Sequence, residues 1–404
     1  MYGFLMDETG REWTSRRRLL QLGGVGMAAI GGCLARFGGF NDGDYRFETS
    51  DIFVSGEDGY TRYRIPALQV TERGTLLAFC EGRRGEGNDR SPTDLLLKRS
   101  EDGGATWTDQ LVVYSEGDKT ISNPTPVVDQ SSGRIYLPLC REYRDVLMTR
   151  SADDGRTWDE PREITSSVKR DGWKYYATGP GVGIQLRREP YSGRLVIPAT
   201  HWNHFWEGEI PDDNVMYDHI IYSDDGGTTW ELGGTVGEHV DEPQAVELTD
   251  GRIMMNMRST PGSDVAASPD GNYRAVATSA DGGGSWSDIS YDETLVTPTC
   301  QGSFVRYSWP DEGRSRILFA NPGHEDSRVD LTIRLSYDAG ESWEYSKVLY
   351  GSRAAYSSLA VLPDGSVGCL FERGTAFSST YEHLTFCRFT IEWLTDGADT
   401  PRAN

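Results

Sequence analysis

The stretch SEDGGATW, residues 100–107, decides the fold, because its pattern S-x-D-x-G-x-T/S-W occurs five times in the chain. The other copies are SADDGRTW at 151–158, SDDGGTTW at 223–230, SADGGGSW at 279–286 and SYDAGESW at 336–343. Successive copies start 51, 72, 56 and 57 residues apart, which indicates one structural unit per copy. An apolar run such as DLLLKR at 94–99 precedes the motif, so each unit is predicted to run from a strand through a tight turn into another strand.

The motif has a mechanical explanation in which every residue type is needed. The aspartate accepts hydrogen bonds from nearby backbone amides, the glycine supplies a positive φ, and the tryptophan packs beside the turn. A unit of about fifty residues matches one four-stranded blade of a β-propeller. Five marked units and one unmarked unit predict an all-β, six-bladed β-propeller. A strand near 45–54 should pair with C-terminal strands near 359–371 and 384–393, which removes the open sheet edge.

Composition limits what the protein can bind. The formal net charge of -22 should repel nucleic acid and anionic membrane surfaces, so any site for an anion must be a local basic pocket. The aspartates of the repeats could in principle bind calcium, but each repeat offers too few clustered oxygens. No metal or other cofactor is therefore expected. The six cysteines match no zinc or disulfide framework and are expected to be core residues. They are Cys33, Cys80, Cys140, Cys300, Cys369 and Cys387.

The N-terminal segment is predicted to be a targeting signal rather than part of the fold. Residues 15–33, SRRRLLQLGGVGMAAIGGC, resemble a twin-arginine export signal, and IGGC also resembles a lipobox that would lipidate Cys33. The alternative is a cleavable signal with an incidental cysteine. No other stretch could span a bilayer. We therefore expect a signal and linker over 1–44, the propeller over 45–396, a tail over 397–404, and an exported protein that is extracellular or held at the cell surface.

The segment YRIPAL, which contains Arg64, connects the propeller to a known family. An arginine followed by Ile-Pro near the start of such a propeller resembles the motif of sialidases, and the five repeats resemble their Asp-boxes. The resemblance covers about residues 50–393. It implies an exo-alpha-sialidase that removes terminal sialic-acid-like sugars from glycans by a retaining mechanism.

By this resemblance, three arginines hold the carboxylate of the sugar. They are Arg64, Arg258 in GRIMMNMRS and Arg328 in HEDSRVDLTIRLS, with Arg353 as an alternative to Arg328. Guanidinium groups suit this task because they form paired, charge-assisted hydrogen bonds with carboxylates and stay ionised.

The resemblance also assigns a nucleophile and its base. Tyr356 in AAYSSLAVLPDG would attack the anomeric carbon, since a neutral phenol avoids the repulsion that a second carboxylate would meet there. Glu242 in HVDEPQAVELTDG would take the tyrosine proton, whereas Glu247 is expected to be a solvent-facing strand residue.

The remaining assignments lie in two short stretches. Asp89 in EGRRGEGNDRSPTDLLLKRS would be the general acid and base, and Asp94 is the alternative. Contact with the leaving group would partly shield a loop aspartate and raise its pKa toward the working range. Arg83 in the same stretch would contact the sugar. Glu372 in GCLFERG would orient Arg64, because a buried arginine cluster needs a carboxylate partner.

Several other residues are candidates for the rim of the site. Trp173, Tyr175 and Tyr176 could line a pocket for the substituents of the sugar or belong to the core, and Asn123 could lie near the site. The histidines in the aromatic loop 201–217 are expected at the surface or in packing, not as metal ligands.

Two other functions remain compatible with the sequence. A trans-sialidase or a hydrolase of a related nonulosonic acid would use the same central residues. A non-catalytic glycan-binding propeller would be expected to lack some of them, and all positions are filled here.

Overall fold

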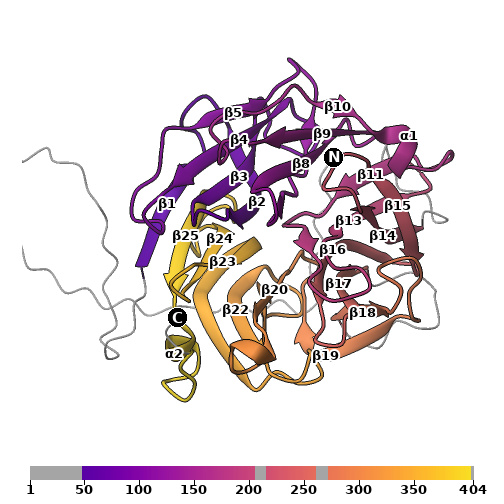
Figure 1. The fold of residues 1–404 in the computed structure, drawn as a ribbon. Coiled ribbons are helices and arrows are strands. Elements are labelled where there is room, and N and C mark those ends of the chain that lie inside the picture. The colour runs from indigo at the N-terminus through magenta and orange to yellow at the C-terminus, as the bar shows by residue number, and fades with distance from the viewer. Residues whose placement is uncertain (1–47, 205–214, 261–271, 402–404) are drawn as a thin grey trace, which may run out of the picture. The chain divides into compact units, whose positions relative to one another are not determined.

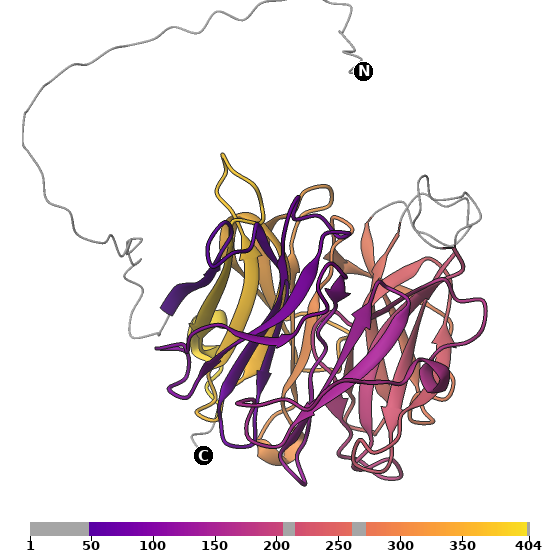
Figure 2. The ribbon, with the colours of Figure 1, turned by 90° about the horizontal axis from the view of Figure 1, so that it is seen from above.

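The structure, a computed structural model, describes residues 48–204, 215–260 and 272–401. These residues form antiparallel sheets set side by side around a central axis, as the blades of a propeller are (Figure 1). The side view shows the sheets standing next to one another with loops at both ends of the ring (Figure 2). The all-β, propeller-like architecture predicted from the repeats is thus confirmed.

Four of the sheets have four or five strands each. The first contains β2 (Arg62–Val70), β3 (Leu76–Arg83), β4 (Thr93–Ser100) and β5 (Leu111–Tyr114). The second contains β6 (Ile121–Ser122), β7 (Val127–Asp129), β8 (Arg134–Arg141), β9 (Asp145–Ser151) and β10 (Arg162–Glu163). The third contains β11 (Tyr175–Thr178), β12 (Ile184–Gln185), β13 (Leu195–Trp202), β14 (Met216–Ser223) and β15 (Glu231–Val236). The fourth contains β16 (Val240–Glu247), β17 (Ile253–Ser259), β18 (Tyr273–Ser279) and β19 (Ser290–Val296).

The fifth sheet has seven strands in the order β1-β25-β24-β23-β22-β21-β20. Its strands are β1 (Glu48–Val54), β20 (Ser303–Ser308), β21 (Arg316–Pro322), β22 (Val329–Ser336), β23 (Tyr345–Val361), β24 (Val367–Arg373) and β25 (His383–Phe389). The long strand β23 pairs with β22 up to Arg353 and with β24 from Ala354 onwards. One strand therefore joins two sets of strands into a single sheet.

The expected pairing of the two chain ends is confirmed. Strand β1 runs antiparallel to β25, with Glu48 opposite Arg388 and Val54 opposite His383. In Figure 1 the indigo β1 accordingly lies beside the yellow β25. This pairing closes the ring between the first and last described strands.

The five repeats form the same turn at the outer end of their strands. In the first, Asp102 accepts hydrogen bonds from the backbone N–H and the hydroxyl of Thr106, at 2.9 and 2.6 Å, and from Ser100. The amide of Gly104 donates back to the Ser100 hydroxyl. Corresponding bonds occur in the other four copies. The carboxylate oxygens are thus used within the turn, which supports a structural role.

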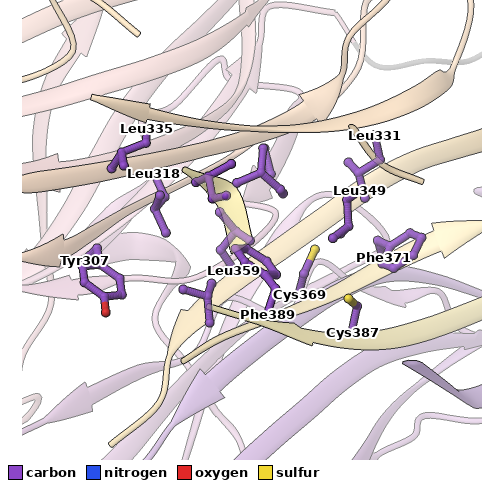
Figure 3. Packing of buried hydrophobic residues seen from close by; sticks show 14 of the residues in the cluster. Tyr307, Leu318, Leu331, Leu335, Leu349, Leu359, Cys369, Phe371, Cys387 and Phe389 are labelled. Atoms are coloured by element: carbon purple, nitrogen blue, oxygen red, sulfur yellow. The ribbon is translucent and has the colours of Figure 1, made fainter. Parts of the chain in front are cut away.

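The repeats also attach each sheet to its neighbour. Trp107 packs against Phe386, and Trp158 packs against Phe79, each across a sheet boundary. A Cβ atom on Gly104 would lie 2.1 Å from the Phe386 ring, so only glycine fits at that turn. Buried leucine, phenylalanine and cysteine side chains fill the space inside the seven-stranded sheet region (Figure 3). Stability of the ring therefore depends on contacts between sheets as well as on the ladders.

Left-handed backbone recurs within or beside one strand of each sheet, namely β2, β6, β11, β16 and β20. The residues are Ile65, Asn123, Gly179, Glu242 and Thr299, with φ between 48 and 58°. In β2 and β16 the ladder shifts its register at these residues. A bulge re-aims the neighbouring side chains, and left-handed φ at a β-branched residue such as Ile65 is costly. Strain of this kind gathers at functional sites.

The rest of the described chain adds little regular structure. Two single-turn helices, α1 (Thr165–Val168) and α2 (Ile391–Leu394), and a 3-10 turn at Pro310–Glu312 lie on the outside of the sheets. Asp399, within the expected tail, forms an ion pair of 2.6 Å with Arg316 of β21. None of the helices is long and apolar enough to cross a membrane among the residues that the structure covers.

Some expectations concern residues elsewhere in the chain. Five cysteines are buried and free, as expected for core residues. The twin-arginine signal, the linker over 1–44 and the lipidation of Cys33 lie outside the described residues.

Candidate active site

Tyr356, Glu242 and Arg258 form one hydrogen-bonded group, although they come from β23, β16 and β17. The Tyr356 hydroxyl donates to Glu242 Oε1 in a short hydrogen bond. Arg258 Nη1 donates to Glu242 Oε2 at 2.9 Å and lies 3.3 Å from the Tyr356 oxygen. Tyr356 is buried, and burial together with Glu242 raises its pKa well above the ordinary value of 10.0, although Arg258 and Arg328 oppose this. The phenol is therefore neutral and hydrogen-bonded to a carboxylate that can accept its proton.

Arg64 approaches the same tyrosine from β2. Its guanidinium carbon lies 5.2 Å from the centre of the Tyr356 ring. The fully buried Glu372 of β24 accepts from Arg64 Nε at 2.5 Å and from the amides of Ile65 and Tyr356 at 3.0 and 3.1 Å. One carboxylate thus fixes the arginine, the strained Ile65 and the strand that carries the tyrosine.

Arg328 completes the cluster from the start of β22. Its guanidinium carbon lies 5.4 Å from the Tyr356 ring centre, and its Nη2 donates to the Thr299 carbonyl at 3.0 Å. Arg353, the alternative to Arg328, lies opposite Val329 in the pairing of β22 with β23, and its side chain is exposed. The structure thus brings Arg64, Arg258 and Arg328 to one tyrosine and leaves Arg353 outside.

Tyr381 belongs to this group and was missed by the sequence analysis. Its hydroxyl accepts from Arg328 Nη1 at 3.0 Å, and its ring lies 3.9 Å from the Arg64 guanidinium carbon. It also lines an open pocket of about 370 Å³ together with Arg62 and Glu382. Its only sequence signal is an aromatic residue after the polar loop FSST, which many surface loops share.

Asp89 lies on the loop between β3 and β4, next to two arginines. Its Oδ1 is 2.5 Å from Arg83 Nη1 and 4.0 Å from Arg64 Nη1, and 42% of its side chain is exposed. Burial favours the protonated form, but Arg83 and Arg64 outweigh it and hold the pKa of Asp89 below its usual value. The expected rise in the pKa of Asp89 depends on shielding by the leaving group and stays a prediction.

Arg83 is itself held by a residue that the sequence analysis passed over. Glu81 is two residues earlier on β3, so both side chains point to the same face, and Glu81 Oε2 lies 2.6 Å from Arg83 Nη2. The other oxygen of Glu81 accepts from the amide of Asn123 at 2.9 Å. Asn123 is thus placed beside the Arg83–Asp89 group.

Two alternatives from the sequence have structural roles instead. Asp94 is buried, accepts from the hydroxyl of Tyr60 at 2.8 Å and lies 3.3 Å from Arg84 Nη2. Glu247 was expected to face solvent, but it is buried and accepts from the backbone amides of Arg187 and Arg188 at 2.6 and 2.8 Å. The expectation that Glu247 faces solvent was wrong, because its carboxylate accepts hydrogen bonds from two backbone amides of a neighbouring loop.

The aromatic stretch before Gly179 is mostly packed. Tyr176 is fully buried, Tyr175 stacks on Trp202, and Trp173 stacks on His201 with 3.4 Å between ring centres. His204 is described by the structure as well, and no group of His, Cys, Asp and Glu that could hold a metal occurs in the three described ranges.

The comparisons with known proteins agree with this fold. A family model described as a BNR repeat-like domain matches residues 74–369. Among curated proteins, a sialidase of Micromonospora viridifaciens is 35% identical over 381 residues, covering 87% of this chain and 55% of that protein. An exo-alpha-sialidase of Aspergillus fumigatus is 31% identical over 386 residues, covering 84% of this chain and 86% of that protein.

Solved structures give the same result. A Hadza microbial sialidase has a TM-score of 0.73 at 29% identity, covering 84% of this chain and 68% of that one. An intramolecular trans-sialidase of Ruminococcus gnavus has a TM-score of 0.70, but its 20% identity shows likeness of fold alone.

The fold and the matched domain define a propeller protein built from BNR repeats. Within that class, the chain belongs to the sialidase family. It spans 55% and 62% of the lengths of the first two curated relatives that it matches.

Proposed function

We propose that the chain is an exo-alpha-sialidase that hydrolyses terminal sialic-acid-like sugars from glycans with retention of configuration. The observation that carries the proposal is the Tyr356 hydroxyl, which donates to Glu242 while three arginines surround its ring and oxygen. The residues implied by the family resemblance meet at one place, although they are far apart in the sequence.

The arginine cluster suits a carboxylate ligand. Arg64 and Arg258 have side chains only 8% and 19% exposed, so water competes weakly for their N–H groups. Arg258 Nε is buried and has no hydrogen-bond partner among the described residues. Paired guanidinium–carboxylate bonds are strong when partly desolvated. The cluster supplies the local positive charge that an anionic sugar needs in a chain of net charge -22.

The tyrosine would act as the nucleophile with Glu242 as its base. The anomeric carbon of such a sugar already carries a carboxylate, so a neutral phenol meets less repulsion than an aspartate or glutamate would. Glu242 takes the phenolic proton as the Tyr356 oxygen forms its bond to the anomeric carbon and the glycosidic bond breaks. Arg258 touches both oxygens and stabilises the negative charge in either position.

Asp89 would serve as the general acid and then as the base. It must carry a proton to protonate the leaving oxygen, whereas Arg83 and Arg64 favour its ionised form in the free site. A bound sugar carboxylate would neutralise Arg64, and the leaving group would shield Asp89 from water. Both effects raise the proton affinity of Asp89 when the substrate is present. Asp89 then activates the water that releases the sugar from Tyr356.

Release of 4-methylumbelliferone from its sialoside tests the proposal. We expect hydrolysis by the wild type, an α-configured sugar as the first product in proton NMR, and loss of at least about 100-fold in kcat for Tyr356→Phe. Tyr350→Phe is the matched control, because Tyr350 lies on the same strand and its hydroxyl, within the described structure, donates to the Gly374 carbonyl.

Full activity of Tyr356→Phe, or a β-configured first product, would contradict the mechanism. A parallel assay with lactose as acceptor separates hydrolysis from transfer, since a trans-sialidase would form sialyllactose at the expense of the free sugar.

The blade count and the destination of the chain also belong to the proposal. We infer six blades, with β23 ending one blade at Arg353 and starting the next at Ala354. An experimental structure in which β23 pairs without a break there would contradict this count.

We also propose export through the N-terminal segment. Replacing Arg16 and Arg17 by lysine should leave the protein inside the cell, and membrane retention lost in Cys33→Ser would indicate the lipid anchor.

A further inference from the structure

Two buried carboxyl groups lie behind Glu242 and are not used by the mechanism above. Asp241 precedes Glu242 on β16 and is 6% exposed. Asp218 lies on β14, which packs against β16, and is fully buried. Buried acidic side chains are rare unless they are paired, so this arrangement needs a reason.

Asp218 forms no ion pair within the described chain. Both of its carboxyl oxygens are buried without a hydrogen bond among the described residues. The hydroxyl of its cross-strand neighbour Thr200 donates to the Tyr217 carbonyl at 3.1 Å. Thr200 and Arg274 favour the ionised form of Asp218, but they do not outweigh burial. An ionised carboxylate there would be very costly. Burial and the nearby Asp241 accordingly raise the pKa of Asp218 well above its usual value.

Asp241 differs because it has a defined partner. Its Oδ1 accepts from the backbone N–H of Glu242 at 3.0 Å. This bond forms at the bulge of β16, where Glu242 adopts a left-handed φ of 48°. Burial and the charge of Glu242 raise the pKa of Asp241 to about 6, although Arg258 opposes the shift. Asp241 therefore changes its charge in the range where such an enzyme would work.

The other groups facing Asp241 keep a constant charge in that range. Arg258 and Arg274 stay cationic, Asp218 stays protonated, and burial raises the pKa of Tyr175 well above 10.0. The buried His201 and His219 lie on the opposite face of their sheet from Thr200 and Asp218, and burial lowers the pKa of His201 to about 3.

We propose that Asp241 is a positioning residue for Glu242. Its carboxylate holds the Glu242 peptide in the left-handed bulge and, when ionised, strengthens Glu242 as the acceptor of the Tyr356 proton, while Asp218 behind it stays neutral. The inference rests on the proposed function, in which Glu242 takes that proton.

The proton step shows why the second charge matters. The O–H bond of Tyr356 breaks and an O–H bond forms at Glu242 Oε1, so the negative charge leaves Glu242 for the tyrosine oxygen. An ionised Asp241 next to Glu242 repels a negative charge there more strongly than at the farther Tyr356 oxygen. The transfer is thus favoured when Asp241 is ionised and becomes less favourable once Asp241 is protonated.

The test is the ratio of kcat for wild type to that for Asp241→Asn, measured with the 4-methylumbelliferyl sialoside from pH 4.5 to 8. We expect a ratio of about ten at pH 7.5, which corresponds to about one pKa unit in the proton affinity of Glu242. The ratio should fall toward one below pH 5, where Asp241 is protonated in the wild type as well. KM should change little, since Asp241 holds no arginine of the cluster. A merely structural defect would give a ratio that does not vary with pH.

Two controls complete the experiment. Asp218→Asn should leave the pH profile unchanged, because the amide replaces a carboxyl that is already neutral. Glu247→Gln removes another buried carboxylate of β16 and should also leave it unchanged. If Asp241→Asn does not fold, Asp241→Ser gives the same ratio test. A ratio that stays constant with pH overturns the role of Asp241, and a shifted profile in Asp218→Asn overturns the neutral state of Asp218. An inactive wild type would instead refute the proposed function.

Discussion

Replacing Glu372 by glutamine should weaken both the fold and the site. Glu372 Oε1 accepts from Arg64 Nε and from the Ile65 amide, and Oε2 accepts from the Tyr356 amide. A glutamine has one acceptor oxygen, so its NH₂ group must face one of these donors, which costs about 1–3 kcal/mol. The buried guanidinium of Arg64 also loses its counter-charge, and breaking a buried pair costs about 3–5 kcal/mol when the partner is removed entirely. Since the glutamine oxygen can keep the two bonds that Oε1 accepts, we expect a total loss of about 3–5 kcal/mol.

Glu247→Gln is the matched control for this change. Glu247 is also buried and accepts two backbone amides, but it forms no ion pair within 4.0 Å in the described structure, so it should lose only about 1–3 kcal/mol. The free energies of unfolding are compared in urea by tryptophan fluorescence, and KM is measured with the aryl sialoside. Only Glu372→Gln should raise KM, by at least about tenfold, because Arg64 would lose its orientation. Equal losses of stability and an unchanged KM would refute the reasoning.

Three further predictions concern the turns and the acid. Gly283→Ala places a Cβ 2.0 Å from Ile220, whereas Gly340→Ala places it 3.3 Å from the flexible Met254, at nearly equal φ. The first should therefore cost about 1–3 kcal/mol more in urea unfolding, and equal costs would show that φ alone requires the glycine. Hydrogen bonds from Thr106 lower the pKa of Asp102 to about 2, so its stabilisation is complete above about pH 4 and is lost as the pH falls through 2. Asp102→Asn should thus flatten the fall of stability between pH 4 and 2 by less than about 1 kcal/mol, since the carboxylate is exposed, and a curve identical to that of the wild type would contradict this. Asp89→Asn should reduce kcat/KM, which reports the steps up to departure of the leaving group, by about 10²–10⁴ for a sialyl glycan but much less for an aryl sialoside, whose leaving group needs little protonation. Equal losses of kcat/KM would exclude Asp89 as the acid.

The repeats made the architecture predictable because their local chemistry is complete within eight residues. Ser100, Asp102 and Gly104 bond to one another and to Thr106, so the turn can be inferred without knowing the rest of the fold. The same residues could not reveal that Gly104 also faces Phe386, because that contact joins positions 282 residues apart.

The candidate site was predictable where a residue lies in a motif. Arg64 and Tyr356 stand in such segments, and the structure brings them together. Tyr381 was missed because its contact with Arg64 crosses from one sheet to another and no local pattern marks it. Glu81 pairs with Arg83 on the same strand, but its second contact, with the Asn123 amide, also joins two sheets. Nothing in the sequence indicated that the guanidinium of Arg83 lies against Asp89 and lowers its pKa.

Because β1 pairs with β25, the ring of sheets can close only after nearly the whole chain has been synthesised. More than 300 residues must be synthesised after Val54 before its partner His383 exists. Until then the backbone N–H and C=O groups of β1 have no partner strand. Such a long-range contact is slow to form and leaves the nascent chain open to mispairing. A chain that ends before β25 would leave β1 without its partner strand. Because β2 follows β1, the position of Arg64 on β2 would then be less well fixed.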